Sequence, residues 1–316
     1  MDYGKFPNLR PEVQDSRVLA QRSVFVDYYE SDDKGEPTGK TPIVTLHGLN
    51  TKFTVTENIG NFYPKAQIGV CNVKATTRDF LTNYMNFSDL HYSKRVLRLY
   101  AGYLQPGEDW HKTPYLFGGN IMYTRFTEPP DIWLNMEVLY KNRVSALTSQ
   151  EWTLKGTQTS ETVLRESAKR LNLGLDIRDM PPYSFTNFTA TGDGKALLRQ
   201  LRYSMPNYAV FVNNGALTVI ARDRKRPAPG ETIWQVREDT GMIGIPVVET
   251  WGVELTTLLN PNMHPGDWVN LVSQHQPAAS GIYIILSITH SGELRGKEFY
   301  TKIQAYYPDP DKRQKK

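Results

Sequence analysis

The sequence predicts a mainly β protein with a small α+β module, flanked by two similar β-barrel or β-sandwich domains. Three observations predict this fold class. Short runs rich in Val, Ile and aromatic residues recur before residue 145 and after residue 231, and Gly, Pro or Asn separates them. Apolar residues at helical spacing occur in the stretch between them. The 316 residues also suffice for two or three domains with cores of their own.

The first β-barrel domain is expected to cover residues 41–148. Several of its β-type runs alternate apolar and polar residues, which is typical of strands with one buried face. These runs are 43–46, 52–56, 66–73, 95–100, 115–117, 121–125 and 132–140. Residues 1–40 are assigned only as an N-terminal segment, because they are polar and end in the turn-rich stretch 31–40, which we expect to be an exposed loop.

The α+β module is expected to cover residues 149–230 and to contain two helices. Apolar residues recur at helical spacing from Ser160 to Leu173, where Ser160 can cap the start and Gly174 can follow the end. A second helix is expected from Asp193 to about Met205, because Pro206 cannot continue it.

A hairpin and a basic linker complete the module. The Asn-Asn-Gly turn at 213–215 predicts a hairpin between 208–212 and 217–221, since Asn and Gly tolerate the positive φ angles of a tight turn. The linker Arg222–Gly230 holds the densest basic cluster of the chain. It is either a solvated exit from the hairpin or a contact for a phosphate backbone.

The second β-barrel domain is expected at 231–308, followed by a basic tail at 309–316. Its β-type runs are 247–249, 253–258, 268–272, 283–289 and 299–306. The order of strands and loops from 268 to 306 repeats the order from 94 to 140. Few residues are identical, so the order indicates an internal duplication without requiring one.

Composition disfavours several classes of protein. The 37 Lys and Arg against 33 Asp and Glu leave a net charge of +4, part of it in the tail, so nucleic acid is not expected as the main partner. The single cysteine, Cys71, excludes an intrachain disulfide framework and a cysteine-based metal cluster. The longest apolar run, Ile282–Leu286, is too short to span a bilayer, and the first residues lack a secretory signal. We therefore expect a chain without a membrane-spanning segment, made in a cytoplasm.

Catalytic motifs are incomplete. His47-Gly48 after a strand is typical of the oxyanion loop of α/β-hydrolases, but no G-x-S-x-G nucleophile elbow follows it. Gly192–Lys195 lacks the flanking residues of a phosphate-binding loop, and Asp193 fits a helix cap there. The histidines have no metal-ligand spacing. We expect no catalytic, cofactor or metal site. A hydrolytic enzyme, such as an α/β-hydrolase-like esterase using His47, remains the alternative.

Several phrases, in order from residue 64 to residue 306, resemble the baseplate hub (tail tip hub) family of tailed bacteriophages. Their matches are Pro64–Leu81, Arg98–Tyr103, Leu116–Ile121, Pro130-Asp131, Thr159–Ile177, Thr240–Leu271 and Ile288–Tyr306. Asn72-Val73 departs from the Asn-Leu pair that is usual in the family, and the first sixty residues match little.

The resemblance implies a structural protein of the virion rather than an enzyme. It implies a homotrimer whose subunits each contribute two barrel domains, so that a threefold ring gains approximate sixfold symmetry. Such a symmetry adaptor would attach to the hexameric tail tube on one side and seat a trimeric central spike or tail tip on the other. Its channel would pass the tape measure protein and DNA, and would need a polar lining that does not hold phosphate.

The resemblance also implies partners and a location. Other baseplate proteins would contact the ring, which would be assembled in the host cytoplasm and end in the tail baseplate. The candidate residues for assembly interfaces lie in the phrases that carry the resemblance: Asn72, Trp251, Asn260, Trp268 and His290.

Overall fold

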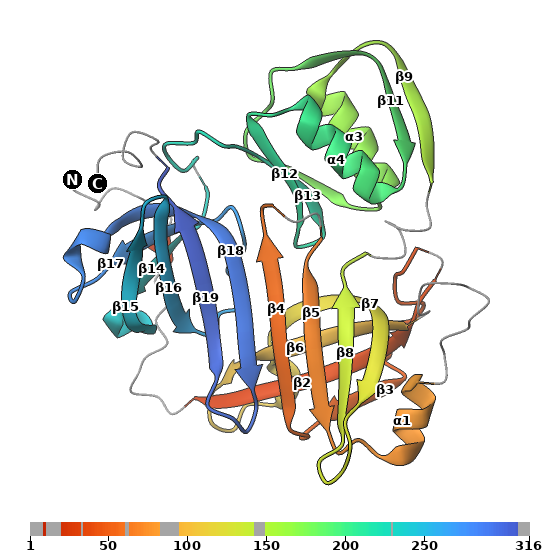
Figure 1. Cartoon of the computed structure of the whole chain (residues 1–316), viewed down its shortest axis with the longest axis vertical. Helices are drawn as coiled ribbons and strands as arrows, with labels where there is room; N and C mark the ends of the chain where they lie inside the picture. Colours follow the sequence, from red (N-terminus) through yellow and green to blue (C-terminus); the bar gives the residue numbers. More distant parts are fainter. Residues whose placement is uncertain are drawn as a thin grey trace.

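A computed structural model of the chain describes residues 9–10, 20–32, 34–60, 63–82, 95–141, 149–228 and 230–308. The predicted basic tail at 309–316 and most of residues 1–19 lie outside these ranges. The described chain is mainly β, as predicted, and most of its strands belong to one large sheet. Three sets of elements, called here the first β-module, the middle module and the second β-module, follow one another along the sequence (Figure 1).

Within the described residues, the first β-module contains seven strands and one α-helix. They are β2 (Gln21–Glu30), β3 (Val44–His47), β4 (Thr51–Asn58), β5 (Lys65–Cys71), α1 (Ala75–Thr82), β6 (Arg95–Leu104), β7 (Tyr115–Phe126) and β8 (Trp133–Leu139), with a 3-10 helix at Trp110–Lys112. The strands pair in the order β4-β5-β8-β7-β6-β2-β3, and every pair is antiparallel. The runs expected at 115–117 and 121–125 form one strand.

Strand β2 lies inside the stretch that the sequence left unassigned. It pairs with β6 over ten residues, and its residues Ser23 to Tyr29 are all buried. Burial on both faces removes the alternation that marks a strand in a sequence, which explains why pattern reasoning missed it.

The middle module packs two helices against short sheets. Its elements are β9 (Gln150–Thr159), α3 (Ser160–Arg170), β10 (Gly174–Ile177), β11 (Ser184–Gly192), α4 (Gly194–Ser204), β12 (Tyr208–Asn213) and β13 (Ala216–Ala221). The predicted helices and hairpin are present, and Asn214 and Gly215 have the positive φ angles expected of the turn. Figure 1 shows α3 and α4 between the β9·β11 pair and β12·β13.

The second β-module contains β14 (Ile233–Arg237), β15 (Met242–Glu249), β16 (Gly252–Leu258), β17 (Trp268–Val272), β18 (Gly281–Glu293) and β19 (Phe299–Tyr306), with 3-10 helices at Glu238–Thr240 and Pro277–Ala279. Its strand order is β15-β16-β19-β18-β17-β14, with β1 (Leu9–Arg10) beside β14. This order matches β4-β5-β8-β7-β6-β2 strand for strand. One difference is that β14 and β17 run parallel, whereas β2 and β6 are antiparallel.

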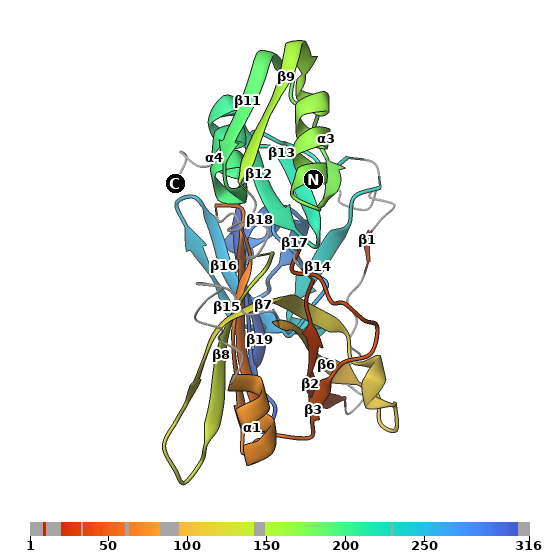
Figure 2. The ribbon, with the colours of Figure 1, turned by 90° about the vertical axis from the view of Figure 1, so that its right-hand side faces the viewer.

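Neither module closes into a barrel among the described residues, because no pairing joins β3 to β4 or β14 to β15. Each module has two layers instead. In the first, β2 and β6 lie behind β4, β5 and β8, and the view turned by 90° shows the same separation (Figure 2). Alternate residues of the strands fill the space between the layers, including Val55, Ile68, Leu97, Leu99 and Leu134.

Strand β18 joins the two β-modules. One edge of this strand pairs with β19. The other edge pairs with β17 over Gly281–Ile284 and with β4 over Ser287–Glu293. As a result, eight strands stand in one row, β15-β16-β19-β18-β4-β5-β8-β7, seen face-on in Figure 1.

Candidate functional site

The three modules meet around a polar cavity of about 830 Å³. The first β-module contributes Tyr103 and Pro114 to its lining, the middle module contributes Asp176 and Arg178, and the second contributes a larger share that includes Asp267. Hollows of this size with a few polar groups are the usual place for a ligand, so the partners of its charged side chains decide what this site can do.

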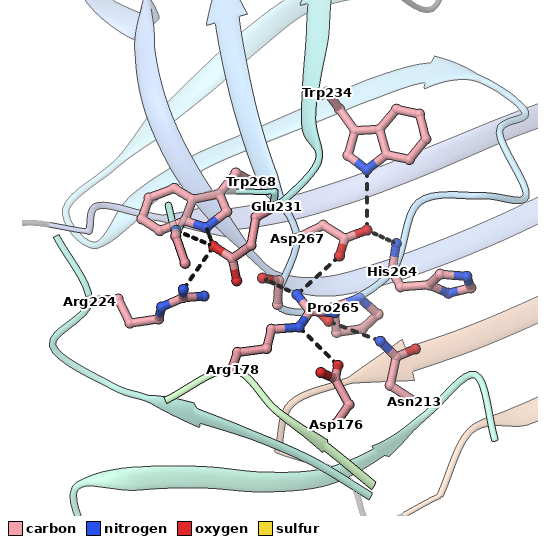
Figure 3. A network of polar contacts seen from close by, with 12 residues as sticks. Asp176, Arg178, Asn213, Arg224, Glu231, Trp234, His264, Pro265, Asp267 and Trp268 are labelled. Carbon is pink, nitrogen blue, oxygen red and sulfur yellow. Dashed lines mark hydrogen bonds and ion pairs between the residues drawn. The ribbon is translucent and has the colours of Figure 1, made fainter. Parts of the chain in front are cut away.

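Arg178 bridges the middle module and the second β-module. Its guanidinium donates to Asp176 Oδ2 (3.0 Å), Gly266 O (3.0 Å) and Asp267 Oδ1 (3.2 Å). Burial disfavours its charge, but Asp267 and Asp176 outweigh burial, and the pKa of Arg178 is raised. Asp267 is held in turn by Trp234 Nε1, which donates to Oδ2 at 3.1 Å (Figure 3). Every charge here has a partner of opposite sign.

Arg224 lies beside this network and corrects the interpretation of the basic linker. Its side chain is only 3% exposed, and it contacts Asp179 Oδ2 and Glu231 Oε2, each at 2.8 Å. Trp268 Nε1 also donates to Glu231 Oε2, at 2.9 Å. Arg224 is therefore part of a buried ion pair, whereas Arg222, Lys225 and Arg226 are exposed, as expected of a solvated exit.

The pKa values of two nearby histidines shift in opposite directions. Burial alone would lower the pKa of His264, but the hydrogen bond and charge of Glu57, whose Oε2 lies 3.2 Å from Nδ1, outweigh it and raise the pKa. His290 is fully buried; burial, with a smaller contribution from His264, lowers its pKa to about 3. Its Nδ1 lies 2.9 Å from Thr301 Oγ1. A neutral, buried imidazole bonded to a hydroxyl serves packing at neutral pH.

The structure scatters the five assembly candidates rather than joining them. Asn72 is exposed after β5, where its backbone and side chain bond to Ile132 in the loop before β8. Trp251 lies half-buried in the β15–β16 turn. Asn260, Trp268 and His290 are buried inside the chain. Of the five, only Asn72 and Trp251 present substantial surface.

Sequence reasoning missed two exposed strand edges. Exposed apolar side chains lie on β7 at Tyr123 (37%) and Phe126 (44%), and on β15 at Ile245 (60%) and Val247 (53%). The signal was present at β15, because the run Met242–Val248 places apolar residues at consecutive positions, where a half-buried strand alternates. Such surface typically marks a site of protein contact.

The α/β-hydrolase and phosphate-loop interpretations lose their structural basis. The α/β-hydrolase fold needs a parallel sheet, whereas the His47 strand lies in an antiparallel one. The His47 ring stacks on Trp110, with centroids 4.1 Å apart. Asp193 caps α4, since Ala196 N donates to Asp193 Oδ1 at 2.7 Å. Within the described residues no group of three or more His, Cys, Asp or Glu is placed to hold a metal ion, and no helix there could span a membrane.

Fold and site together define a mainly β structural protein whose buried charges hold its modules to one another. The family model described as baseplate hub gp41 matches residues 35–305. The chain therefore belongs to the baseplate hub gp41 family, and it is a component of the phage tail baseplate. No curated protein matches its sequence.

Solved structures share the fold at low sequence identity. The 43 kDa tail protein of prophage MuSo2 from Shewanella oneidensis is 11% identical, with a TM-score of 0.58 over 92% of this chain and 99% of that one. A tail protein from Neisseria meningitidis MC58 is 8% identical, with a TM-score of 0.57 over the same shares. A chain of the Francisella PdpA-VgrG complex in its lidless form is 9% identical, with a TM-score of 0.51 over 92% of this chain and 66% of that one.

Proposed function

We propose that the chain is a non-enzymatic hub that forms a homotrimeric ring, adapts the hexameric tail tube to a trimeric central spike or tail tip, and encloses a channel for the tape measure protein and DNA. One observation carries the proposal: two β-modules in one chain have the same strand order. Three such chains present six similar modules, which can meet a sixfold partner, while the middle modules remain threefold.

The face of the eight-strand row that points away from the cores supports the channel. It is polar, with Lys52, Thr54 and Thr56 on β4 alternating with buried residues. Its charges are mixed and paired, as between Lys302 Nζ and Glu254 Oε1 at 2.6 Å. A lining without an excess of positive charge would let a phosphate backbone pass without holding it.

The hydrogen bonds that arginine side chains donate between modules support a rigid adaptor. Arg178 ties the middle module to the second β-module. Arg202 donates to Ile59 O (2.8 Å) and Gly60 O (2.6 Å) and so ties α4 to the end of β4. Contacts of this kind oppose rotation of the middle module against the sheet.

The test is the mass of the particle in solution. Light scattering behind a sizing column is expected to give about 108 kDa for three chains of 36.1 kDa, and images of the particle are expected to show three or six lobes around a hole. A chain that stays monomeric at high concentration would contradict the proposal.

A further inference from the structure

We infer that the β7 edge of one chain pairs with the β15 edge of a second copy, in the register by which β18 pairs with β4 inside the chain. The inference rests on the proposed homotrimer and names the surface that closes it. It starts from the two ends of the eight-strand row, which are β7 and β15.

The two β-modules agree residue by residue as well as strand by strand. In the first, Asn120 of β7 pairs with both Val96 and Leu139. In the second, Ile284 of β18 pairs with both Trp268 and Tyr306. The positions Asn120 and Ile284 are therefore equivalent.

Each middle strand also carries a bulge at the same place. The register of β7 against β8 shifts between Ile121 and Tyr123, and that of β18 against β19 shifts between Ile285 and Ser287. A bulge is a specific local feature of a strand pair, so its repetition fixes the alignment across the shift. Residues 123–126 of β7, and Thr127 directly after it, are thus equivalent to residues 287–291 of β18.

The outer hairpins align in the same way. Thr56 of β4 pairs with the first residue of β5, Lys65, and Glu249 of β15 pairs with the first residue of β16, Gly252. The first residue of β5, Lys65, pairs with the last residue of β8, and the first residue of β16, Gly252, pairs with the last residue of β19. Glu249 is therefore equivalent to Thr56.

The equivalent edges differ in whether another strand pairs with them. The second half of β18 is covered by β4, but the second half of β7, Ile121–Phe126, has β8 on one edge and no strand on the other among the described residues. Likewise, β16 is the one described strand that pairs with β15. Uncovered edges offer a row of backbone N–H and C=O groups to another strand.

Transferring the β4·β18 register gives complementary partners. Inside the chain, Thr289 pairs with Thr56. Arg125 is equivalent to Thr289, and Glu249 is equivalent to Thr56. The same register therefore places Arg125 opposite Glu249 of the second copy. Both side chains are exposed and opposite in charge. Directly opposed charges of unlike sign favour a strand pair.

The neighbouring positions are apolar. Inside the chain, His290 pairs with Val55, and the same register places Phe126 opposite Val248. At the next position, the exposed Val247 lies opposite Thr127. Trp251, one of the sequence candidates, comes beside Tyr123 at the other end. Pro246 lacks a backbone N–H, so the ladder ends there. The exposed side chains of both edges would lose solvent contact together.

The joint is head-to-tail, because β7 of each chain meets β15 of the next. A head-to-tail contact closes into a ring when its rotation divides the circle. The proposed ring then has alternating joints, β18·β4 inside each chain and β7·β15 between chains, with the same geometry at every joint.

Disulfide trapping tests the register. Arg125→Cys and Glu249→Cys are introduced together into Cys71→Ala protein, which removes the native thiol. Paired residues have Cα atoms about 4.5–5.5 Å apart, within the range of a disulfide. Oxidised protein is expected to give covalent dimers and trimers, and nothing larger, on a non-reducing denaturing gel. The matched control pairs Arg125→Cys with Ile243→Cys, six residues along β15, and is expected to give no covalent trimer.

The outcomes separate this joint from the trimer itself. A particle of about 108 kDa that cross-links no better than the control overturns the pairing and leaves the trimer standing. A ladder beyond three chains overturns the closed ring. A monomer overturns both the proposed function and the pairing.

A second set of variants does not depend on oxidation. Arg125→Glu is expected to raise the concentration at which trimers dissociate by about tenfold, since it places like charges together. Adding Glu249→Arg to this variant is expected to return the dissociation concentration to that of the parent protein. Lys65→Glu, on the same face but inside the row, is the matched control and is expected to change nothing. Failure of the double variant to restore assembly would refute the register.

Discussion

Replacing Arg224 with Met is expected to loosen the junction between the middle module and the second β-module. The guanidinium contacts two carboxylates, Asp179 and Glu231, and its side chain is 3% exposed. Met keeps much of the aliphatic volume but has no charge. The substitution therefore leaves two carboxylates facing the place of one missing cation.

The expected loss in the free energy of unfolding depends on how far each carboxylate is shielded from water. Removing one member of a buried ion pair costs about 3–5 kcal/mol, because the other charge stays buried without compensation. Glu231 is 14% exposed, but Asp179 is 29% exposed and regains water more easily. We therefore expect the lower end, about 3 kcal/mol, for Arg224→Met.

Thermal unfolding followed by circular dichroism measures the effect. At about 2–4 °C per kcal/mol, the midpoint is expected to fall by about 6–12 °C. The matched control is Arg222→Met, because Arg222 lies in the same basic run but is exposed, and it is expected to stay within about 0.5 kcal/mol of the parent. Equal midpoints for the two variants would refute the view that Arg224 is a buried junction residue.

Three further predictions concern single residues. His290 has a folded pKa of about 3, below its unfolded value, so the native state is expected to lose about 1.4 kcal/mol for each pH unit below about 6.5, and His290→Gln is expected to flatten that slope in urea titrations between pH 7 and 4.5. Gly252→Ala would place a Cβ 2.0 Å from a backbone oxygen of β19 and is expected to cost at least about 2 kcal/mol, whereas Gly39→Ala, with open space around it, is expected to cost far less; equal losses would contradict the close approach. Asp193→Ala removes the cap of α4 and is expected to lower stability by about 1 kcal/mol, and an unchanged melting midpoint would show that water replaces the cap.

Local patterns in the sequence predicted much of the fold. The middle module is the clearest case, because caps, helical spacing and the Asn-Gly turn are each set by residues close in sequence. The repeated strand order was also indicated, since it follows from the sequence of strands and loops. Strand β2 was missed, because its burial on both faces erases the period of two.

The site was harder to predict, since it depends on contacts between distant residues. Arg224 appeared as part of a charged linker, and only its carboxylate partner Asp179, from another segment, reveals a buried pair. The place of Trp268 and His290 in family-like phrases predicts them as interface residues, but no local pattern distinguishes a buried Trp or His from an exposed one. The open edges of β7 and β15 arise from the pairing of whole strands.

The ladder between β4 and β18 sets the order in which the molecule can be completed during translation. It joins residues 52–58 to residues 287–293, so the ribosome must make every element from β5 to β17 before the central strands of the row can meet. Contacts so distant in sequence form late, because a long loop must close first. A nascent or truncated polypeptide that ends before β18 lacks the strand that joins β19 to β4, and it therefore cannot build the row.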